Sequence, residues 1–146
     1  MQMCLKYHWK KAHGKKRLQK NMLLVDANIA LRYILEDEKE LALRARDIID
    51  ENYIEMPIEV LSEIVYVLRS VYKIDKEVIN SRLLYFFENT ECKIPHKESV
   101  LCGLKYYATT NLDFVDCILA GYREVEDREI ATFDVNLQKL IAKIMG

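Results

Sequence analysis

The chain has 146 residues, of which 51% are hydrophobic and 31% charged, and its formal net charge is −1. This composition excludes a disordered polypeptide, and the length favours one domain whose core needs no disulfide to hold it together. Because no hydrophobic run approaches the roughly 20 residues of a membrane-spanning helix, we expect a protein that has no membrane partner.

The charge is distributed unevenly along the chain. Residues 1–20 carry seven Lys or Arg side chains and no acidic one, whereas the rest of the chain is acidic. We therefore expect a basic N-terminal extension over residues 1–21 and a folded domain over residues 22–146. Three interpretations of the extension stay open: a disordered or non-native segment ahead of a start at Met22, a basic arm that attracts RNA phosphates, and an amphipathic transit peptide.

The cysteine pattern favours a reducing compartment. The four cysteines form no C-x-x-C pair, and no secretory hydrophobic segment is visible, so we expect a cytoplasmic protein with free thiols. Cys92 and Cys117 are interpreted as small buried hydrophobic residues.

The first half of the folded part alternates short apolar runs with helical patterns. The run Leu23-Leu-Val is wholly apolar, which is typical of a central strand covered on both faces. Asn28 can cap the helix that follows, and Pro57 is suited to the first turn of a later one. The elements expected here are a strand over 22–25, helices over 28–35 and 38–51, a strand over 53–56 and a helix over 57–72.

The second half continues this alternation. The elements expected here are a helix over 75–89, a strand over 92–95, helices over 97–108 and 111–122, a strand over 129–132 and a helix over 134–144. Strands that alternate with helices or helix pairs predict an α/β fold with a mainly parallel sheet. In such sheets, ligands bind beyond the carboxyl ends of the strands.

Four carboxylates lie beside predicted strand ends or in predicted helices. If the fold brings them together, their mutual repulsion must be neutralised by a proton or by a hard divalent cation. Carboxylate oxygens suit Mg²⁺ or Mn²⁺ better than zinc, and a metal held in this way most often serves phosphoryl chemistry. The four residues are Asp26, Glu63, Asp116 and Asp134.

Each of these acids also has a structural interpretation that stays open. Asp26 can bond its own backbone in a turn, and Asp134 can be the N-cap of the last helix. Glu63 lies opposite the apolar stripe of its helix, so the pattern alone favours a solvent-exposed position.

Asp113 and Asp116 are three residues apart and can both serve the start of one helix. We choose Asp116 as the metal ligand because its neighbours are apolar, and Asp113 as the cap or support. Thr132 and Asn136 offer neutral oxygens near Asp134.

Taken together, four stretches of this chain resemble the PIN-domain nucleases, and within them the VapC-type toxins of prokaryotic type II toxin–antitoxin systems. They occur in the family's order and at its usual separations, and the likeness runs from Met22 to the C-terminus. Cys117 stands where a small residue is usual, and residues 1–21 have no counterpart. The stretches are residues 24–35, 60–68, 113–120 and 131–137.

The resemblance implies a three-layer α/β/α sandwich and a Mg²⁺- or Mn²⁺-dependent endoribonuclease in the cytoplasm. Carried over position by position, it implies that the four acids are both catalytic residues and metal ligands, with Asn28 and Asp113 as polar neighbours. It thereby moves Glu63 from a solvent-facing to a functional interpretation. A small antitoxin protein and a homodimer are the implied partners, beside the RNA substrate.

Two other functions stay open. A magnesium-dependent phosphatase on a similar sheet usually has a second acid two residues after the first, and position 28 is Asn. A catalytically silent module that binds RNA or protein would not need all four acids. For the nuclease, we expect Arg32 to be among the local cations that guide substrate phosphates to the site, and the Tyr-bearing helices to offer a groove for an antitoxin helix.

Overall fold

The computed structural model describes residues 22–146. The predictions made for residues 1–21 lie outside the described residues, so the expected boundary between an extension and a domain stays a prediction. No helix of the described part is long and apolar enough to cross a membrane.

The described chain alternates short strands with helices in the predicted order. The strands are β1 (Met22–Leu24), β2 (Tyr53–Glu55) and β3 (Cys92–Lys93). The helices are α2 (Ala27–Leu35), α3 (Lys39–Asp50), α4 (Ile58–Ser70), α5 (Lys76–Asn89), α6 (Lys97–Thr109), α7 (Phe114–Glu126) and α8 (Val135–Met145).

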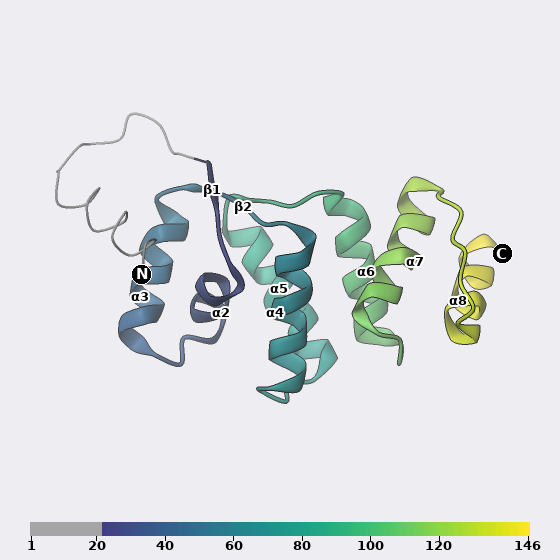
Figure 1. Ribbon diagram of the computed structural model, residues 1–146, viewed down its shortest axis with the longest axis horizontal. Helices are drawn as coiled ribbons and strands as arrows, with labels where there is room; N and C mark the ends of the chain where they lie inside the picture. Colours follow the sequence, from purple (N-terminus) through teal and green to yellow (C-terminus); the bar gives the residue numbers. More distant parts are fainter. Residues whose placement is uncertain (1–21) are drawn as a thin grey trace.

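The three strands form one parallel sheet in the order β1-β2-β3. Met22 pairs with Tyr53, and Ile54 pairs with Cys92. The predicted α/β class with a parallel sheet is thereby confirmed. The sheet lies toward one end of an elongated molecule, and α6, α7 and α8 follow in a row toward the other end (Figure 1).

The core is built from the apolar faces that the helical periodicity predicted. Ile54 of β2 and Met56 are fully buried, as are Leu61 of α4 and Phe86 of α5. Cys92 and Cys117 are buried free thiols, as predicted. Burial of such side chains removes apolar surface from water and supplies most of the driving force for folding.

Three details of the predicted elements are wrong. The strand predicted to be central and covered on both faces is the edge strand β1, in which Leu24 is 59% exposed. Asn28 does not cap α2, because Asp26 does so: the Ile29 N–H donates to Asp26 Oδ1 at 3.2 Å, and Asn28 lies inside the helix. The strand predicted over 129–132 is absent, since residues 127–134 adopt no regular structure. Its β-prone residues have no strand beside them, and a strand exists only where a ladder satisfies its backbone.

Helices α6 and α7 pack at very short distance through two glycines. A Cβ on Gly121 would lie 2.1 Å from the Ser99 carbonyl oxygen, and one on Gly103 would lie 2.9 Å from the Cys117 carbonyl oxygen. Only residues without a Cβ allow the two backbones this approach. The two helices therefore form one closely packed hairpin.

A polar contact closes one end of this hairpin. The buried Ser99 hydroxyl donates to Glu126 Oε2 at 2.6 Å, and His96 Nδ1 lies 2.9 Å from the same oxygen. The hydrogen bond from Ser99 is the main reason that the pKa of Glu126 lies below its ordinary value of 4.5. A carboxyl group whose pKa is lowered by folding stabilises the fold at pH values above its unfolded pKa.

We expect Ser99→Ala to lower the urea midpoint of unfolding at pH 7. The difference in urea midpoint between the variant and the unchanged protein should shrink as the pH falls below about 4.5. It should vanish once the pH is below the pKa that Glu126 has in the folded protein, because protonation removes the charge that Ser99 stabilises. Urea titrations of both proteins at pH 7 and at successively lower pH measure this. His96 is present in both proteins, so the difference isolates the hydroxyl group. A deficit that stays constant with pH would contradict the expected linkage.

Candidate metal centre

Asp26 and Glu63 line one open pocket beside the carboxyl end of β1. The pocket has a volume of about 270 Å³. Asp26 lies there because it follows β1 and caps α2. Glu63 reaches it from α4. The remaining lining residues come from α2 and from the C-terminal half of α4 and the residues after it: Ala27, Asn28, Leu31, Arg32, Val67, Val71 and Tyr72.

The orientation of Glu63 follows from the periodicity of α4. Leu61, Ile64 and Val65 are buried on the core side of the helix, which leaves Glu63 exposed. The pattern-based prediction of an exposed side chain is therefore correct, and the exposed position faces the pocket that also holds Asp26.

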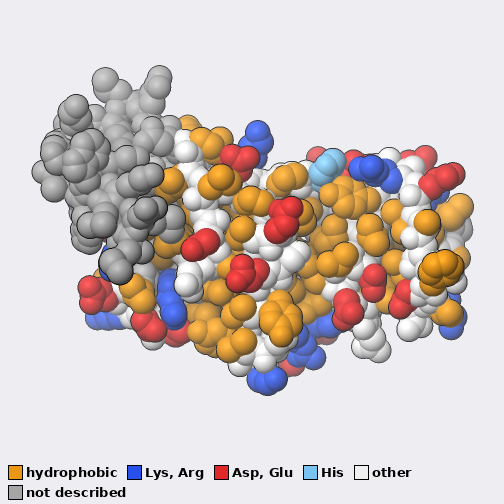
Figure 2. Space-filling model, in the orientation of Figure 1, with side chains coloured by type: hydrophobic (Ala, Val, Ile, Leu, Met, Phe, Trp, Pro, Cys, Tyr) orange, Lys and Arg blue, Asp and Glu red, His pale blue; other side chains and the backbone are white. Residues whose placement is uncertain are grey.

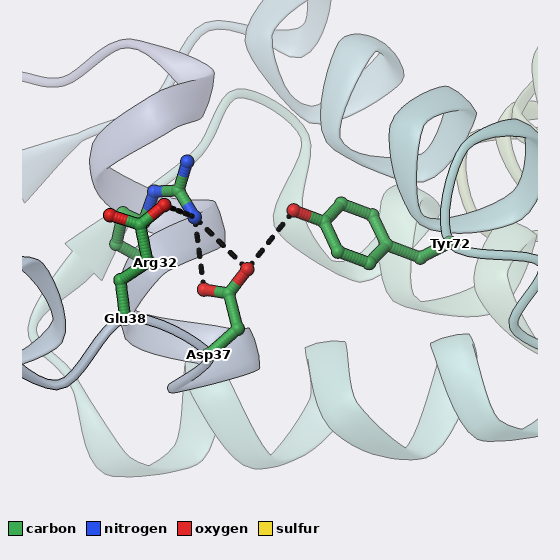
Figure 3. Close-up of polar contacts among 4 residues, drawn as sticks. All are labelled: Arg32, Asp37, Glu38 and Tyr72. Atoms are coloured by element: carbon green, nitrogen blue, oxygen red, sulfur yellow. Dashed lines mark hydrogen bonds and ion pairs between the residues drawn. The ribbon is translucent and has the colours of Figure 1, made fainter.

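Arg32 brings positive charge to the same pocket, where Asp37 and Glu38 hold it and Tyr72 in turn bonds to Asp37 (Figure 3). Its Nη1 lies 3.0 Å from both carboxylate oxygens of Asp37 and 3.4 Å from Glu38 Oε1, and the Tyr72 hydroxyl donates to Asp37 Oδ2 at 3.1 Å. The hydrogen bond with Asp37 is the main cause that raises the pKa of Arg32. Partial burial alone would raise the pKa of Asp37, but the bonds from Arg32 and Tyr72 outweigh it and lower that pKa.

The sequence interpretation named Arg32 but missed Asp37 and Tyr72. Asp37 lies in the turn between α2 and α3, five residues after Arg32, and Tyr72 lies just after α4. The spacing of Arg32 and Asp37 is a local signal that could have been used. The contribution of Tyr72 depends on how α4 packs against α2, which no local pattern predicts.

A second acidic group forms where α7 and α8 begin. Asp116 lies in the first turn of α7, with Asp113 at the N-cap position of the same helix. Asp134 is the N-cap of α8, since the Leu137 N–H donates to its Oδ1 at 2.8 Å. Partial burial raises the pKa of Asp116, and the negative charges of Asp134 and Asp113 raise it further. Asp116 and Asp134 are therefore close enough to repel one another.

The neutral residues predicted around Asp134 have different positions. Thr132 Oγ1 accepts a hydrogen bond from the Asp134 N–H at 3.0 Å, and the Thr132 carbonyl accepts one from Gln138 Nε2. Asn136 is exposed in the first turn of α8. Thr132 thus supports the loop that presents Asp134.

The structure brings the four predicted acids together in two pairs, Asp26 with Glu63 and Asp116 with Asp134. Acidic side chains gather over α2 and α4 and again over α7 and α8 on one face of the molecule, with hydrophobic side chains between them (Figure 2). Among residues 22–146, no group of three or more His, Cys, Asp or Glu side chains is arranged to hold a metal ion. The four-acid metal site therefore stays a prediction.

The donor set of the first pair nevertheless suits a magnesium ion. Two carboxylates and the Asn28 amide line the same pocket, which is open to solvent. Mg²⁺ is commonly bound by only one or two carboxylates and keeps several water molecules or substrate phosphate oxygens as its other ligands. Asp26 and Glu63 would hold such an ion.

Comparison with known proteins identifies the family. Residues 23–143 match the family model for the PIN domain. No curated protein matches the chain. No solved structure matches it either. Since the family match covers all but the ends of the chain, this protein belongs to the PIN-domain family, whose members are generally nucleases.

Proposed function

We propose that the protein is a Mg²⁺- or Mn²⁺-dependent endoribonuclease that hydrolyses RNA phosphodiester bonds in the cytoplasm, as the toxin of a toxin–antitoxin pair. The observation that carries this proposal is the pocket in which Asp26 and Glu63 face Arg32. Two carboxylates suit a metal ion, and a guanidinium group suits the phosphate that the ion would activate.

Each residue of the pocket has a role in this proposal. A divalent ion, when bound, polarises the scissile phosphate and lowers the pKa of a water molecule. Asp26 and Glu63 would hold the ion in this pocket, and the family resemblance implies that Asp116 and Asp134, which lie outside it, complete the acidic set. Arg32 binds a phosphate oxygen, and Asp37 and Tyr72 keep its guanidinium in position. A carboxylate of the pocket that the ion does not fully engage would take the proton from the attacking water.

The residue after Ala27 favours a nuclease over a phosphatase. A phosphatase of the alternative kind would use a second acid there as a general acid, and the residue is Asn28, whose side chain cannot donate a carboxyl proton. Asn28 lines the pocket as a neutral oxygen donor instead.

An apolar rim beside the pocket supports an antitoxin partner. Val71 and Tyr72 line the pocket and are 64% and 40% exposed, and Tyr66 on α4 is 66% exposed. An amphipathic antitoxin helix laid on this rim would bury these side chains and could place a basic residue against Asp26 and Glu63. Such a partner would block substrate access.

Incubation of the full chain with structured RNAs tests the proposed activity. We expect internal cleavage with Mg²⁺ or Mn²⁺, none after EDTA treatment, and recovery when the metal is restored. A small phosphate ester should not be hydrolysed, whereas a phosphatase would hydrolyse it. Absence of RNA cleavage at every metal concentration, with the protein folded by circular dichroism, would refute the proposal.

Arg32→Gln is expected to lower kcat/KM for RNA about tenfold or more, because hydrogen bonds to charged groups contribute roughly 1.5–3 kcal/mol. Arg32→Lys should retain part of the activity, since it keeps the charge and loses the planar fork. Initial rates over a range of RNA concentrations measure the effect. Arg46→Gln, on α3 and outside the pocket, is the matched control. Equal rates for the Arg32 and Arg46 variants would exclude Arg32 from substrate binding.

A further inference from the structure

One lysine from a neighbouring helix holds the turn between α6 and α7. Residues 110–113 form this turn, and Lys76, the first residue of α5, reaches it with its ammonium group. Lys76 Nζ donates to the Leu112 carbonyl at 2.6 Å and to the Thr110 carbonyl at 3.3 Å. A single side chain of α5 thereby fixes the backbone of the turn at two points.

The other surroundings of Lys76 favour a cation at this place. Nζ lies 4.5 Å from the centroid of the buried Tyr107 ring, which packs edge-on against Phe114, the first residue of α7. The face of an aromatic ring attracts a positive charge. Among residues 22–146, no carboxylate forms an ion pair with Lys76. Its partners are therefore two carbonyl oxygens and a ring, all of which belong to the α6–α7 hairpin.

The position of Lys76 in its own helix does not account for its presence. A positive charge in the first turn lies beside the positive end of the helix dipole, which disfavours it. Glu77, the next residue, is of the type that this turn favours. We therefore attribute Lys76 to the contact with the turn, which offsets the unfavourable interaction with the dipole.

The turn leads directly into the two acids at the start of α7. Asp113 follows the buried Leu112 and occupies the N-cap position, where its side chain makes no capping hydrogen bond. Its carbonyl accepts a hydrogen bond from the Cys117 N–H at 3.1 Å, which closes the first turn of the helix around Asp116. The place of the Leu112 carbonyl thus determines where α7 begins and how both carboxylates are presented.

A second cation connects this arrangement to the helix that carries Glu63. Arg69 of α4 donates from Nη1 to the Ile74 carbonyl at 3.2 Å, which ties the segment before α5 to α4. Lys76 follows two residues after Ile74, and α4 also contacts α7 directly. The start of α7 is therefore tied through Lys76 and Arg69 to the helix that supplies Glu63 to the pocket.

We propose that Lys76 is a positioning residue, which holds the turn between α6 and α7 so that Asp116 can join Asp26 and Glu63 in holding a divalent ion. This inference rests on the proposed function, because it takes Asp116 as part of the acidic set. Lys76 is partly buried and its donors are committed to carbonyl oxygens, so it acts through the backbone of the turn and not on a substrate phosphate.

Titration of the full chain with Mn²⁺ by calorimetry tests this role without RNA. Lys76→Met keeps the length of the side chain but removes its charge and donors, and it should weaken Mn²⁺ binding about tenfold, the lower end for loss of a residue that supports a metal ligand. Lys76→Arg, whose guanidinium can donate to both carbonyls, should recover most of the affinity. Should Lys76→Met not fold, Lys76→Gln, which keeps an amide donor, should show a smaller loss.

The matched control is Lys39→Met. Lys39 is the first residue of α3, so it has the same place in its helix as Lys76 in α5, but it is exposed and does not line the pocket. This variant should bind Mn²⁺ as the unchanged protein does. A loss of Mn²⁺ affinity equal to that of Lys76→Met would show that the effect comes from the lost charge alone and would overturn the inference.

Two measurements separate positioning from a general loss of stability. Amide hydrogen exchange of residues 110–117 should be faster in Lys76→Met than in Lys39→Met. When Asp116→Asn is already present, Lys76→Met should cause little further loss of Mn²⁺ affinity, because both changes act through the same ligand. Equal exchange, additive losses, or an unchanged Mn²⁺ affinity of Lys76→Met would each overturn the inference.

RNA cleavage by the same preparations distinguishes this inference from the proposed function. The expected Mn²⁺ results in a protein that cleaves no RNA would refute the proposed function and leave the role of Lys76 standing. Cleavage by the unchanged protein, with Mn²⁺ affinity unaltered in Lys76→Met, would refute the role of Lys76 alone. An unchanged protein that binds no Mn²⁺ would overturn both.

Discussion

Asp26→Asn and Glu63→Gln are each expected to lower metal-dependent RNA cleavage by at least about 100-fold. Loss of a residue that only supports a metal ligand typically lowers metal affinity or activity about 10- to 100-fold, and loss of the carboxylate ligand itself should cost more. Both residues line the same pocket, and both substitutions remove a charge without changing the size of the side chain. Single-turnover rates at saturating Mg²⁺ measure the loss. A titration with Mn²⁺ then shows whether a higher metal concentration restores part of the rate.

The fold should survive both substitutions, so that lost activity reports on chemistry alone. Asn caps helices about as well as Asp, and Glu63 is exposed, so urea midpoints should change little. Asp75→Asn, at the N-cap position of α5, and Glu59→Gln, one turn before Glu63 on α4, are the matched controls. Activity that persists in both pocket variants would remove Asp26 and Glu63 from the metal site.

Gly121→Ala is expected to destabilise the protein by about 3 kcal/mol or more, at the upper end for overpacked cores. The added Cβ would lie 2.1 Å from the Ser99 carbonyl oxygen and 3.0 Å from the Gly103 nitrogen. Both are backbone atoms, so no side-chain rotation relieves the overlap, and α6 and α7 must move apart. Urea or thermal unfolding measures the loss. In cells, the same loss of stability should appear as a marked fall in the yield of soluble protein.

Two further glycines calibrate this prediction. Gly146→Ala would place its Cβ no closer than 3.4 Å to the Ala142 carbonyl oxygen, so its midpoint should not change. Gly103→Ala meets the mobile end of the Ile118 side chain at 2.8 Å but also the Cys117 carbonyl oxygen, and should be intermediate. If Gly121→Ala unfolds with the midpoint of Gly146→Ala, the α6–α7 contact is looser than the structure indicates.

Local patterns predicted most of the secondary structure because the forces that form these elements act over a few residues. The helical periodicity that buried Leu61 and Val65 also exposed Glu63, and Pro57 lies at the N-cap of α4, one residue before the first turn in which it was expected. The same logic failed at residues 129–132. Their β-prone sequence specifies a strand only when another strand supplies the hydrogen bonds, and that partner is a matter of long-range placement.

The candidate site shows the same difference between what local sequence patterns predict and what long-range packing decides. Asp26 and Glu63 share a pocket because β1, α2 and α4 lie together in the fold, and Asp116 and Asp134 are close because α7 and α8 pack side by side. No spacing in the sequence separates the four acids into these two pairs. The support that Tyr72 gives to Arg32 through Asp37 likewise depends on a hydrogen bond between residues that are 35 apart in the sequence.

The sequence by itself determined which residue types were available for chemistry, the order and approximate bounds of the helices, and which family the chain belongs to. Each of these depends on local preference or on the order of short motifs. Only the tertiary structure decided which carboxylates share a pocket, that Asp37 binds both Arg32 and Tyr72, and that no strand of residues 22–146 pairs with the outer edge of β1. The physical reason is that contacts between distant segments depend on how whole helices and strands pack, and neighbours along the chain do not encode that packing.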